Sequence, residues 1–286
     1  SSQNTGDFHN PDQEGSERLR RSVMDTIRRF REDLKKYWKY TRYAAKSQLK
    51  SEVASSYLNW LWWILDPLLF MLVYTFIALV VFKKSVEYFP VFVFIGLTCW
   101  NFFNKCVLGS VKVVKNNRQI VTKVYIPKFL LVVQKMLVNG FKMVISFALV
   151  LIMMVIYQVP ITWKILYFFP IMLVLILLTF GCSNIMLHFG VFVDDLQNVM
   201  TVVLRLIFYM SGIFYSIGHT VPEPYQTILL KCNPVAFVMD SLRRCMLYSQ
   251  MPGRKLIIVW GLIGLILSFI SVKIVYKYEN SYVKVI

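Results

Sequence analysis

The chain has 286 residues, of which 57% are hydrophobic, a mean hydropathy of +0.56 and a formal net charge of +17. A water-soluble fold of this length cannot bury so large an apolar fraction, so the composition predicts an integral membrane protein. Lys and Arg gather in an N-terminal arm and at the ends of apolar runs. The positive-inside rule and anionic lipid explain that placement better than nucleic acid does, so no nucleic-acid partner is expected.

The N-terminal region divides into two parts. Residues 1–30 are polar and basic and predict a disordered cytoplasmic arm. Residues 33–52 predict an amphipathic helix that lies in the headgroup plane of an anionic membrane surface. Its mostly apolar stripe consists of Leu34, Tyr37, Trp38, Thr41, Ala45, Gln48 and Leu49, and its basic stripe of Lys35, Lys39, Arg42, Lys46 and Lys50.

Six apolar segments are long enough to cross a bilayer. They cover about residues 58–82, 89–111, 137–157, 165–191, 199–217 and 256–276. Their continuous apolarity excludes the period-two alternation of a barrel and predicts an all-α protein with six transmembrane helices. Arg205 and the pair Ser211-Gly212 interrupt the fifth segment, so a break is expected there.

The connection between the fifth and sixth segments, Ser216 to Lys255, is the longest one. It contains apolar stretches too short to span, separated by Pro222, Pro224 and Pro234. Two short re-entrant helices are expected, because irregular backbone at membrane depth needs surrounding protein or a water-filled cavity.

The distribution of positive charge predicts that both termini are cytoplasmic. The arm before the first segment and the connection between the second and third are strongly basic, the latter through Lys112, Lys115, Arg118, Lys123, Lys128 and Lys135. One group of residues disagrees with this orientation, because it falls on the outer side: Lys231, Arg243, Arg244, Arg254 and Lys255.

Ionisable residues inside membrane spans are costly and are candidates for function. We interpret Lys112 and Lys142 as anchors that reach the interface, and Arg205 as a partner for Asp66 or Asp195. The three His are scattered, so neither a metal site nor a catalytic residue is expected. We interpret the five Cys as small buried hydrophobic residues, and whether Cys232 and Cys245 form a disulfide stays open.

Four stretches in order resemble the membrane subunit of type-2 ABC exporters of polysaccharides, O-antigens and teichoic acids. The stretches are Ser55–Trp62 with Asp66-Pro67, then Gly96–Phe103, then Ile120–Lys128, and finally Ser211–Tyr215 with Val221-Pro222, Asn233-Pro234 and Arg243. The resemblance covers about residues 38–277 and assigns residues 31–286 to a type-2 ABC transmembrane domain. Two positions depart from the family pattern: Asn59 stands where Gly is frequent, and Val193–Leu196 replaces an Arg-Asp pair.

The resemblance implies a transporter made of two copies of this chain and two copies of a nucleotide-binding ATPase, in a bacterial or archaeal plasma membrane. The sequence contains no GxxxxGK[ST] loop, so ATP and Mg are expected on the ATPase and no cofactor on this chain. The chain is therefore expected to be a transport subunit and not an enzyme.

The segment from Asn116 to Lys128 is expected to be a cytoplasmic helix that docks in a cleft of the ATPase. Its coupling residues are Asn116, Arg118, Lys123, Tyr125 and Pro127. Basic side chains here, Lys115 included, suit acidic residues of a partner, and Pro127 ends the helix. The alternative is an ordinary basic loop that obeys the positive-inside rule.

A sugar chain needs a wide path with flat aromatic faces. The candidate path residues are Trp60, Trp63, Trp100, Phe103, Phe208, Tyr215 and Arg243. The alternative for the aromatic residues is the interfacial belt common to membrane proteins, and for Arg243 a lipid headgroup contact. The basic residues Lys39, Arg42 and Lys46 are candidates for guiding the diphosphate of a lipid-linked substrate toward this path.

The function expected from the resemblance is export of a lipid-linked polysaccharide or teichoic acid from the cytoplasm. Two alternatives stay open: a type-2 ABC permease for drugs or small lipids, and a membrane-embedded glycosyltransferase or acyltransferase. The second would need catalytic carboxylates, and the pair Asp194-Asp195 is the nearest approach to such a site.

Overall fold

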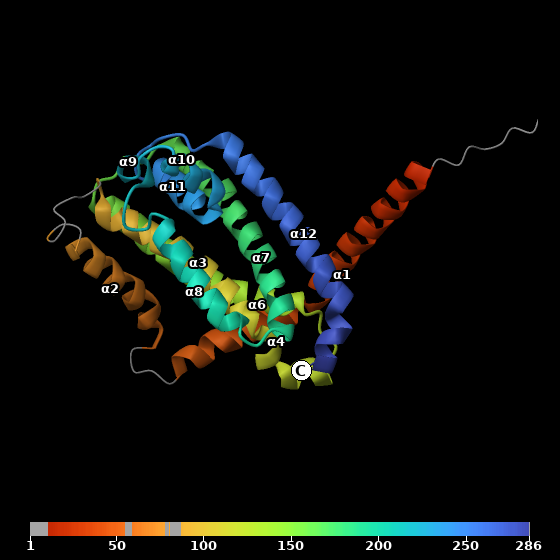
Figure 1. Ribbon diagram of the computed structural model, residues 1–286. Coiled ribbons are helices and arrows are strands. Elements are labelled where there is room, and N and C mark those ends of the chain that lie inside the picture. Colours follow the sequence, from red (N-terminus) through yellow and green to blue (C-terminus); the bar gives the residue numbers. More distant parts are fainter. Residues whose placement is uncertain (1–10, 55–58, 78–79, 81–86, 286) are drawn as a thin grey trace, which may run out of the picture. The chain divides into compact units, whose positions relative to one another are not determined.

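The computed structural model describes residues 11–54, 59–77, 80 and 87–285, and every regular element in these ranges is helical (Figure 1). The chain divides into two compact units, residues 1–39 and 40–286. The longest helix, α1 (Pro11–Ala54), belongs to both. The sequence predicts disorder over residues 1–30, whereas residues 11–30 are helical and residues 1–10 lie outside the described ranges. Ion pairs one turn apart favour the helix, with 2.9 Å between Arg28 Nε and Glu32 Oε1.

The two faces of α1 differ as the sequence predicts. All five members of the basic stripe, from Lys35 to Lys50, are exposed. On the other face Thr41 and Ala45 are buried, with exposed fractions of 1% and 5%. The part of α1 from Tyr40 onward is thus packed along one side and basic along the other.

Four helices within the described ranges are long and apolar enough to cross a membrane. They are α3 (Phe89–Val111), α6 (Phe129–Ile156), the 3-10 turn η3 (Trp163–Tyr167) continued by α7 (Phe168–Phe192), and α12 (Arg254–Val285). Two further apolar helices are shorter: α2 (Trp62–Phe76), which follows the 3-10 turn η1 (Asn59–Leu61), and α8 (Leu196–Met210). At 15 residues each extends about 22 Å, less than the roughly 30 Å of a hydrocarbon core.

These helices confirm the all-α membrane class, while the number of complete spans stays a prediction. The residues expected at the end of the first span, 78–79 and 81–82, lie outside the described ranges. Helix α6 begins at Phe129 rather than near residue 137, because Gln134 and Lys135 continue the helix instead of ending it. Helix α8 ends at Met210, and Gly212 follows with a φ of +64°, as the expected break requires.

Helix α3 is the centre of the bundle in residues 40–286. It packs against α2, α6, α7, α8 and the later helix α11 (Figure 1). Residues Val91 to Ile95 are almost completely buried. Of the four helices in the described ranges that are long and apolar enough to span, α3 is the most enclosed, since 78% of its most apolar stretch is buried compared with 22–39% for the other three. The mainly apolar outer surfaces of those three are consistent with contact to lipid.

Small residues allow two of the closest helix contacts. Helices α7 and α12 share the most extensive interface, where a Cβ added to Gly181 would lie 2.8 Å from Cγ of Leu267. A Cβ added to Gly190 in α7 would overlap the backbone carbonyl of Val111 at the end of α3. Lipid tails provide no hydrophobic drive between spans, so such close backbone packing is a main source of association.

The connection before α12 folds into three short helices, α9 (Ile217–Thr220), α10 (Tyr225–Cys232) and α11 (Pro234–Met246). Helices α10 and α11 correspond to the two predicted re-entrant stretches. Asn233 caps α11 by accepting hydrogen bonds from the backbone N–H groups of Val235 and Ala236, and Pro234 occupies the first turn.

Arg243 near the end of α11 joins three parts of the chain. Its Nε donates to the carbonyl of Phe92 in α3 at 3.1 Å, and its two terminal nitrogens donate to the carbonyls of Gly212 and Ile213 at 2.7 and 2.9 Å. The guanidinium lies 3.4 Å from the ring centroid of Phe92, and the residue is 4% exposed. A buried cation with these partners stabilises the turn after α8 against α3 and α11.

Replacing Arg243 with Leu should destabilise the protein, because three buried carbonyls lose their charged donor. We expect the free energy of unfolding to fall by about 3 kcal/mol. Unfolding of the purified protein by a denaturing detergent measures this change.

Arg244→Leu is the matched control, since Arg244 is part-exposed and pairs with Asp240 one turn away on the same helix, at 2.6 Å. We expect a loss below about 1 kcal/mol for this variant. Equal losses in the two variants would contradict the structural role of Arg243.

Candidate functional site

The connection between α3 and α6 forms a compact surface element rather than one helix. It consists of α4 (Val113–Asn116), α5 (Arg118–Lys123) and an extended stretch that reaches Pro127. The sequence predicts a helix in the segment from Asn116 to Lys128, ended by Pro127. The backbone turns at Asn117 instead, and a residue that precedes Pro is disfavoured from the α region, so the chain is extended before Pro127.

Buried side chains hold this element and leave one side exposed. Val113, Val114, Val121 and Ile126 are each at most 4% exposed. Four of the five predicted coupling residues, Asn116, Arg118, Lys123 and Tyr125, are exposed, and the fifth, Pro127, is buried. The hydrophobic side chains on the exposed side are Ile120, Val124 and the same Tyr125, with exposed fractions of 41%, 55% and 52%. A basic rim around apolar side chains is suited to docking in a protein cleft. We call Arg118–Tyr125 the coupling surface.

The coupling surface is connected to the ends of two long helices. The hydroxyl of Tyr125 donates to the carboxylate of Glu279 in α12 at 3.2 and 3.3 Å. Lys128, at the start of α6, is 2% exposed and donates to the carbonyl of Ile126 at 3.1 Å. Burial lowers the pKa of Lys128, and the nearby Glu279 carboxylate opposes that shift. Glu279 was not predicted from the sequence, because it is far from residue 125 in the chain and polar like its surroundings.

An ion pair connects the α3–α6 connection to the turn between α7 and α8. Lys115 Nζ lies 2.5 Å from Asp194 Oδ1. The hydrogen bond and charge of Lys115 lower the pKa of Asp194 below its ordinary value of 3.8. Asp194 belongs to the stretch that departs from the Arg-Asp pattern of the family, so this chain retains an acidic partner at that turn. No ion pair of Arg205 with Asp66 or Asp195 occurs in the described ranges, and all three side chains are exposed.

Aromatic side chains of three helices meet beside α3. The ring of Trp100 lies 5.5 Å from that of Phe208 and 6.1 Å from that of Phe103. Phe214 is 5.4 Å from Phe208 and stacks on Tyr74 of α2 at 3.6 Å. The structure thus brings together three of the predicted path residues, Trp100, Phe103 and Phe208.

The remaining path candidates lie elsewhere. Trp60 lies in η1 and Trp63 in the first turn of α2, where Trp63 meets Phe141 edge-on at 5.8 Å. The hydroxyl of Tyr215 donates to the carbonyl of Tyr209. The guanidinium of Arg243 is occupied by backbone carbonyls, as described above.

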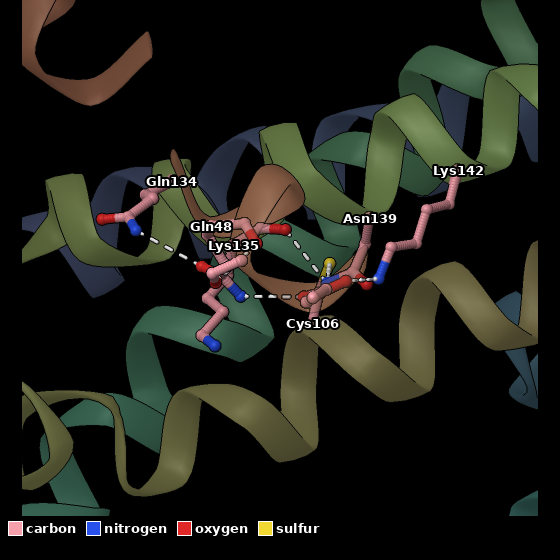
Figure 2. Close-up of polar contacts among 8 residues, drawn as sticks. Gln48, Cys106, Gln134, Lys135, Asn139 and Lys142 are labelled. Atoms are coloured by element: carbon pink, nitrogen blue, oxygen red, sulfur yellow. Dashed lines mark hydrogen bonds and ion pairs between the residues drawn. The ribbon is translucent and has the colours of Figure 1, made fainter. Parts of the chain in front are cut away.

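The end of α1 is fastened to α6 by polar contacts (Figure 2). Gln134 donates to the side-chain oxygen of Gln48 at 3.3 Å, and Lys142 pairs with Glu52 at 2.5 Å. Lys142 is therefore an ion-pair partner and not merely an anchor that reaches the interface. Arg42 and Lys46 are exposed on the other side of the helix, and Lys39 is exposed at the end of the first unit.

Polar residues of four helices line a cavity near these contacts. The cavity has a volume of about 300 Å³ and lies between the end of α1, the start of α2, α3 and α6. Its polar lining includes Glu52, Asp66, Asn101, Lys105, Asn139 and Lys142. Asp66 and Lys142 were candidates from the sequence as separate residues, and the group as a whole was not predicted. The spacings Asn101–Lys105 and Asn139–Lys142 place each pair on one helix face, which is the signal that was available.

Comparison with known proteins assigns the chain to a family. The model of the ABC-2 type transporter family matches residues 41–247, more than half of the chain. The chain belongs to the ABC-2 type transporter family. It is therefore a transport component and a multi-pass membrane protein, and family membership implies an ATPase partner subunit.

Curated relatives match over most of their own length. The chain is 27% identical over 220 residues to the O-antigen export system permease protein RfbA of Myxococcus xanthus, covering 77% of this chain and 85% of the relative. It is 24% identical over 239 residues to a protein of the same name from Klebsiella pneumoniae, covering 83% and 91%.

Loss of the Lys115–Asp194 ion pair should loosen the α3–α6 connection. We expect Asp194→Asn to increase the rate of amide hydrogen exchange in residues 113–123 at neutral pH. In the wild type the pair is intact above the ordinary pKa of Asp194 and is lost as the pH falls through its lowered pKa, below 3.8.

Asp195→Asn serves as the control, because Asp195 is exposed and forms no ion pair with any residue that the structure describes. Exchange in residues 113–123 should not change in that variant. A charge-exchanged Lys115→Asp/Asp194→Lys protein should return to wild-type exchange rates, and failure to do so would argue against the pair.

Proposed function

We propose that this chain is the permease subunit of an ATP-driven exporter that moves a lipid-linked polysaccharide or teichoic acid out of the cytoplasm. The observation that carries the proposal is the match, over most of both chains, to relatives named O-antigen export permeases. The absence of a phosphate-binding loop from the sequence supports an ATPase on a separate subunit. In the working transporter, two copies of each subunit assemble in a bacterial or archaeal plasma membrane with both termini of this chain in the cytoplasm.

The coupling surface is our proposed docking site for the ATPase. Its apolar centre, formed by Ile120, Val124 and Tyr125, suits a cleft, and Arg118 and Lys123 suit an acidic rim. Movement of this surface would reach α6 through Ile126 and Pro127, and α12 through the Tyr125–Glu279 hydrogen bonds. A displacement of the coupling surface on ATP binding would thus pass to α6 through a few residues of the chain and to α12 through these hydrogen bonds.

The aromatic cluster of Trp100, Phe103 and Phe208 is our proposed part of the sugar path. Flat aromatic faces suit pyranose rings, and uncharged walls allow a long polymer to slide. Phe208 is partly exposed, while Trp100 and Phe103 are 5% and 7% exposed, so α2 or α8 must move for the cluster to open. Both are short helices, and Phe214, in the turn after α8, contacts Tyr74 of α2.

Removal of the chain from its host tests the function directly. We expect the polymer to be synthesised but to accumulate in the cytoplasm, with none on the cell surface, as detected with a polymer-specific antibody before and after lysis. A cell that makes no polymer at all would indicate the transferase alternative. A cell with normal surface polymer would indicate the permease for drugs or small lipids.

Complementation with variants tests the coupling surface in the same cells. We expect Arg118→Ala/Lys123→Ala/Tyr125→Ala to reach the membrane at wild-type amounts, to co-purify less ATPase and to restore at most about a tenth of surface polymer. Lys231→Ala, which removes an exposed charge of α10, is the control and should restore export fully.

The basic face of α1 is our proposed entry guide for the lipid diphosphate. We expect Lys39→Gln/Arg42→Gln/Lys46→Gln to reduce export severalfold while co-purification of the ATPase is unchanged, because each charge contributes about 1 kcal/mol near an anionic headgroup layer. The control removes three exposed charges at the other end of the bundle, Lys231→Gln/Arg254→Gln/Lys255→Gln. Unchanged export in the α1 variant would exclude the guiding role.

A further inference from the structure

The polar cavity between α1, α2, α3 and α6 has balanced charge. Two cations, Lys105 and Lys142, and two carboxylates, Glu52 and Asp66, line it. Lys142 and Glu52 form an ion pair at 2.5 Å and so neutralise each other (Figure 2). Asp66 and Lys105 are exposed, and no ion pair involves either within the part of the chain that the structure describes. The cavity therefore presents one free negative and one free positive group.

The position of the cavity favours a lipid over a water-soluble ligand. Asp66 is on α2 and Lys105 on α3, both apolar helices, and the cavity reaches from the end of α1 to Thr98 and Ser146. Beside it, Trp62 and Phe141 are 46% and 48% exposed on α2 and α6. A polar cavity with an exposed apolar flank matches a molecule whose headgroup enters the cavity and whose acyl chains lie along the helices.

We propose that this cavity binds the headgroup of a zwitterionic membrane lipid with a primary ammonium, of the phosphatidylethanolamine class. Lys105 and the amide of Asn101 interact with the phosphate, and Asp66 interacts with the ammonium beside the ring of Trp62. The lipid belongs to the leaflet that faces the end of α1. The site is separate from transport of the polymer, because a substrate diphosphate would bring two or more negative charges to a cavity whose described residues offer a single free cation and a free carboxylate.

A carboxylate also distinguishes among zwitterionic lipids. A primary ammonium donates hydrogen bonds to Asp66, whereas a quaternary choline ammonium has no N–H donor and relies on aromatic faces. Of the two Trp rings that line the cavity in the described ranges, Trp63 already has the ammonium of Lys142 at 5.7 Å from its centroid, which leaves only Trp62 for a choline group. We therefore expect ethanolamine lipids to bind more tightly than choline lipids.

Native mass spectrometry of the full chain in mild detergent tests the proposal. Phosphatidylethanolamine, phosphatidylcholine and phosphatidylglycerol with the same acyl chains are added in turn, together with soluble glycerophosphoethanolamine in a fourth arm. We expect phosphatidylethanolamine to bind about tenfold more tightly than the other two lipids, which is about 1.4 kcal/mol. Equal affinity for the three lipids would overturn the proposal, and soluble headgroup bound as tightly as the lipid would overturn the lipid assignment.

Two variants locate the site. Asp66→Asn should abolish the preference for phosphatidylethanolamine over phosphatidylcholine, and Lys105→Gln should weaken binding of both. Lys112→Gln is the matched control, since it removes an exposed lysine at the end of the same helix, outside the cavity, and should leave all affinities unchanged. If Asp66→Asn retains the wild-type preference, the cavity is not the binding site. Lipid binding is measured without ATP or polymer, so this test and the export test can fail independently.

Discussion

The burial of one guanidinium organises the end of the bundle that contains α9, α10 and α11. Arg243 is enclosed and forms no ion pair with a carboxylate of the described ranges; three backbone carbonyls and the Phe92 ring offset the loss of its hydration. Two of those carbonyls belong to the turn after α8 and the third to α3. Gly96 leaves room for the side chain, since a Cβ there would lie 2.5 Å from a terminal nitrogen of Arg243. The stretches Ser211–Tyr215, Asn233-Pro234 and Arg243, which carried part of the family resemblance, are thus one structural unit.

The opposite end of the bundle is arranged around the coupling surface. There the chain leaves α3, turns through two short helices and enters α6 at a buried Pro and Lys. Gly190 permits α7 to touch the last residue of α3, and the Lys115–Asp194 pair attaches the turn after α7 to the same connection. Force applied at α5 therefore acts on a place where α3, α6, α7 and α12 all terminate or make contact, and not on an isolated loop.

The sequence predicted much of this fold because apolar runs, Pro and Gly act locally. The break after α8 followed from Ser211-Gly212, and the short helices α10 and α11 followed from the spacing of the prolines. The extended chain before Pro127 and the early start of α6 were missed. The basic run before Pro127 suggested one continuous helix, whereas the residue before a Pro is disfavoured from the α region. The polar pair Gln134-Lys135 suggested that the span begins after it, whereas both residues continue α6.

For the candidate sites, the sequence predicted residues that lie close together in the chain but not contacts between distant helices. The candidate coupling residues were chosen from one continuous stretch of sequence, and four of the five are exposed in the structure. The roles of Glu279, Glu52 and Lys105 depend on helices that meet from distant parts of the chain, and a single sequence carries little information on such contacts. Arg243 was chosen for its charge on the outer side, and its three backbone partners were not visible from its neighbours in the sequence.

The two polar attachments between α1 and α6 also bear on how the protein accommodates membranes of different thickness. Contacts at Gln48 and at Glu52, one turn apart, fix both the position and the direction of the end of α1 against α6. Its depth is then a property of the protein and not of the surrounding bilayer. Hydrophobic mismatch must be absorbed elsewhere, by tilting of elements with fewer contacts. Helices α2 and α8, the short ones beside the aromatic cluster, have fewer contacts and can tilt, so bilayer thickness and the arrangement of the aromatic cluster are mechanically linked.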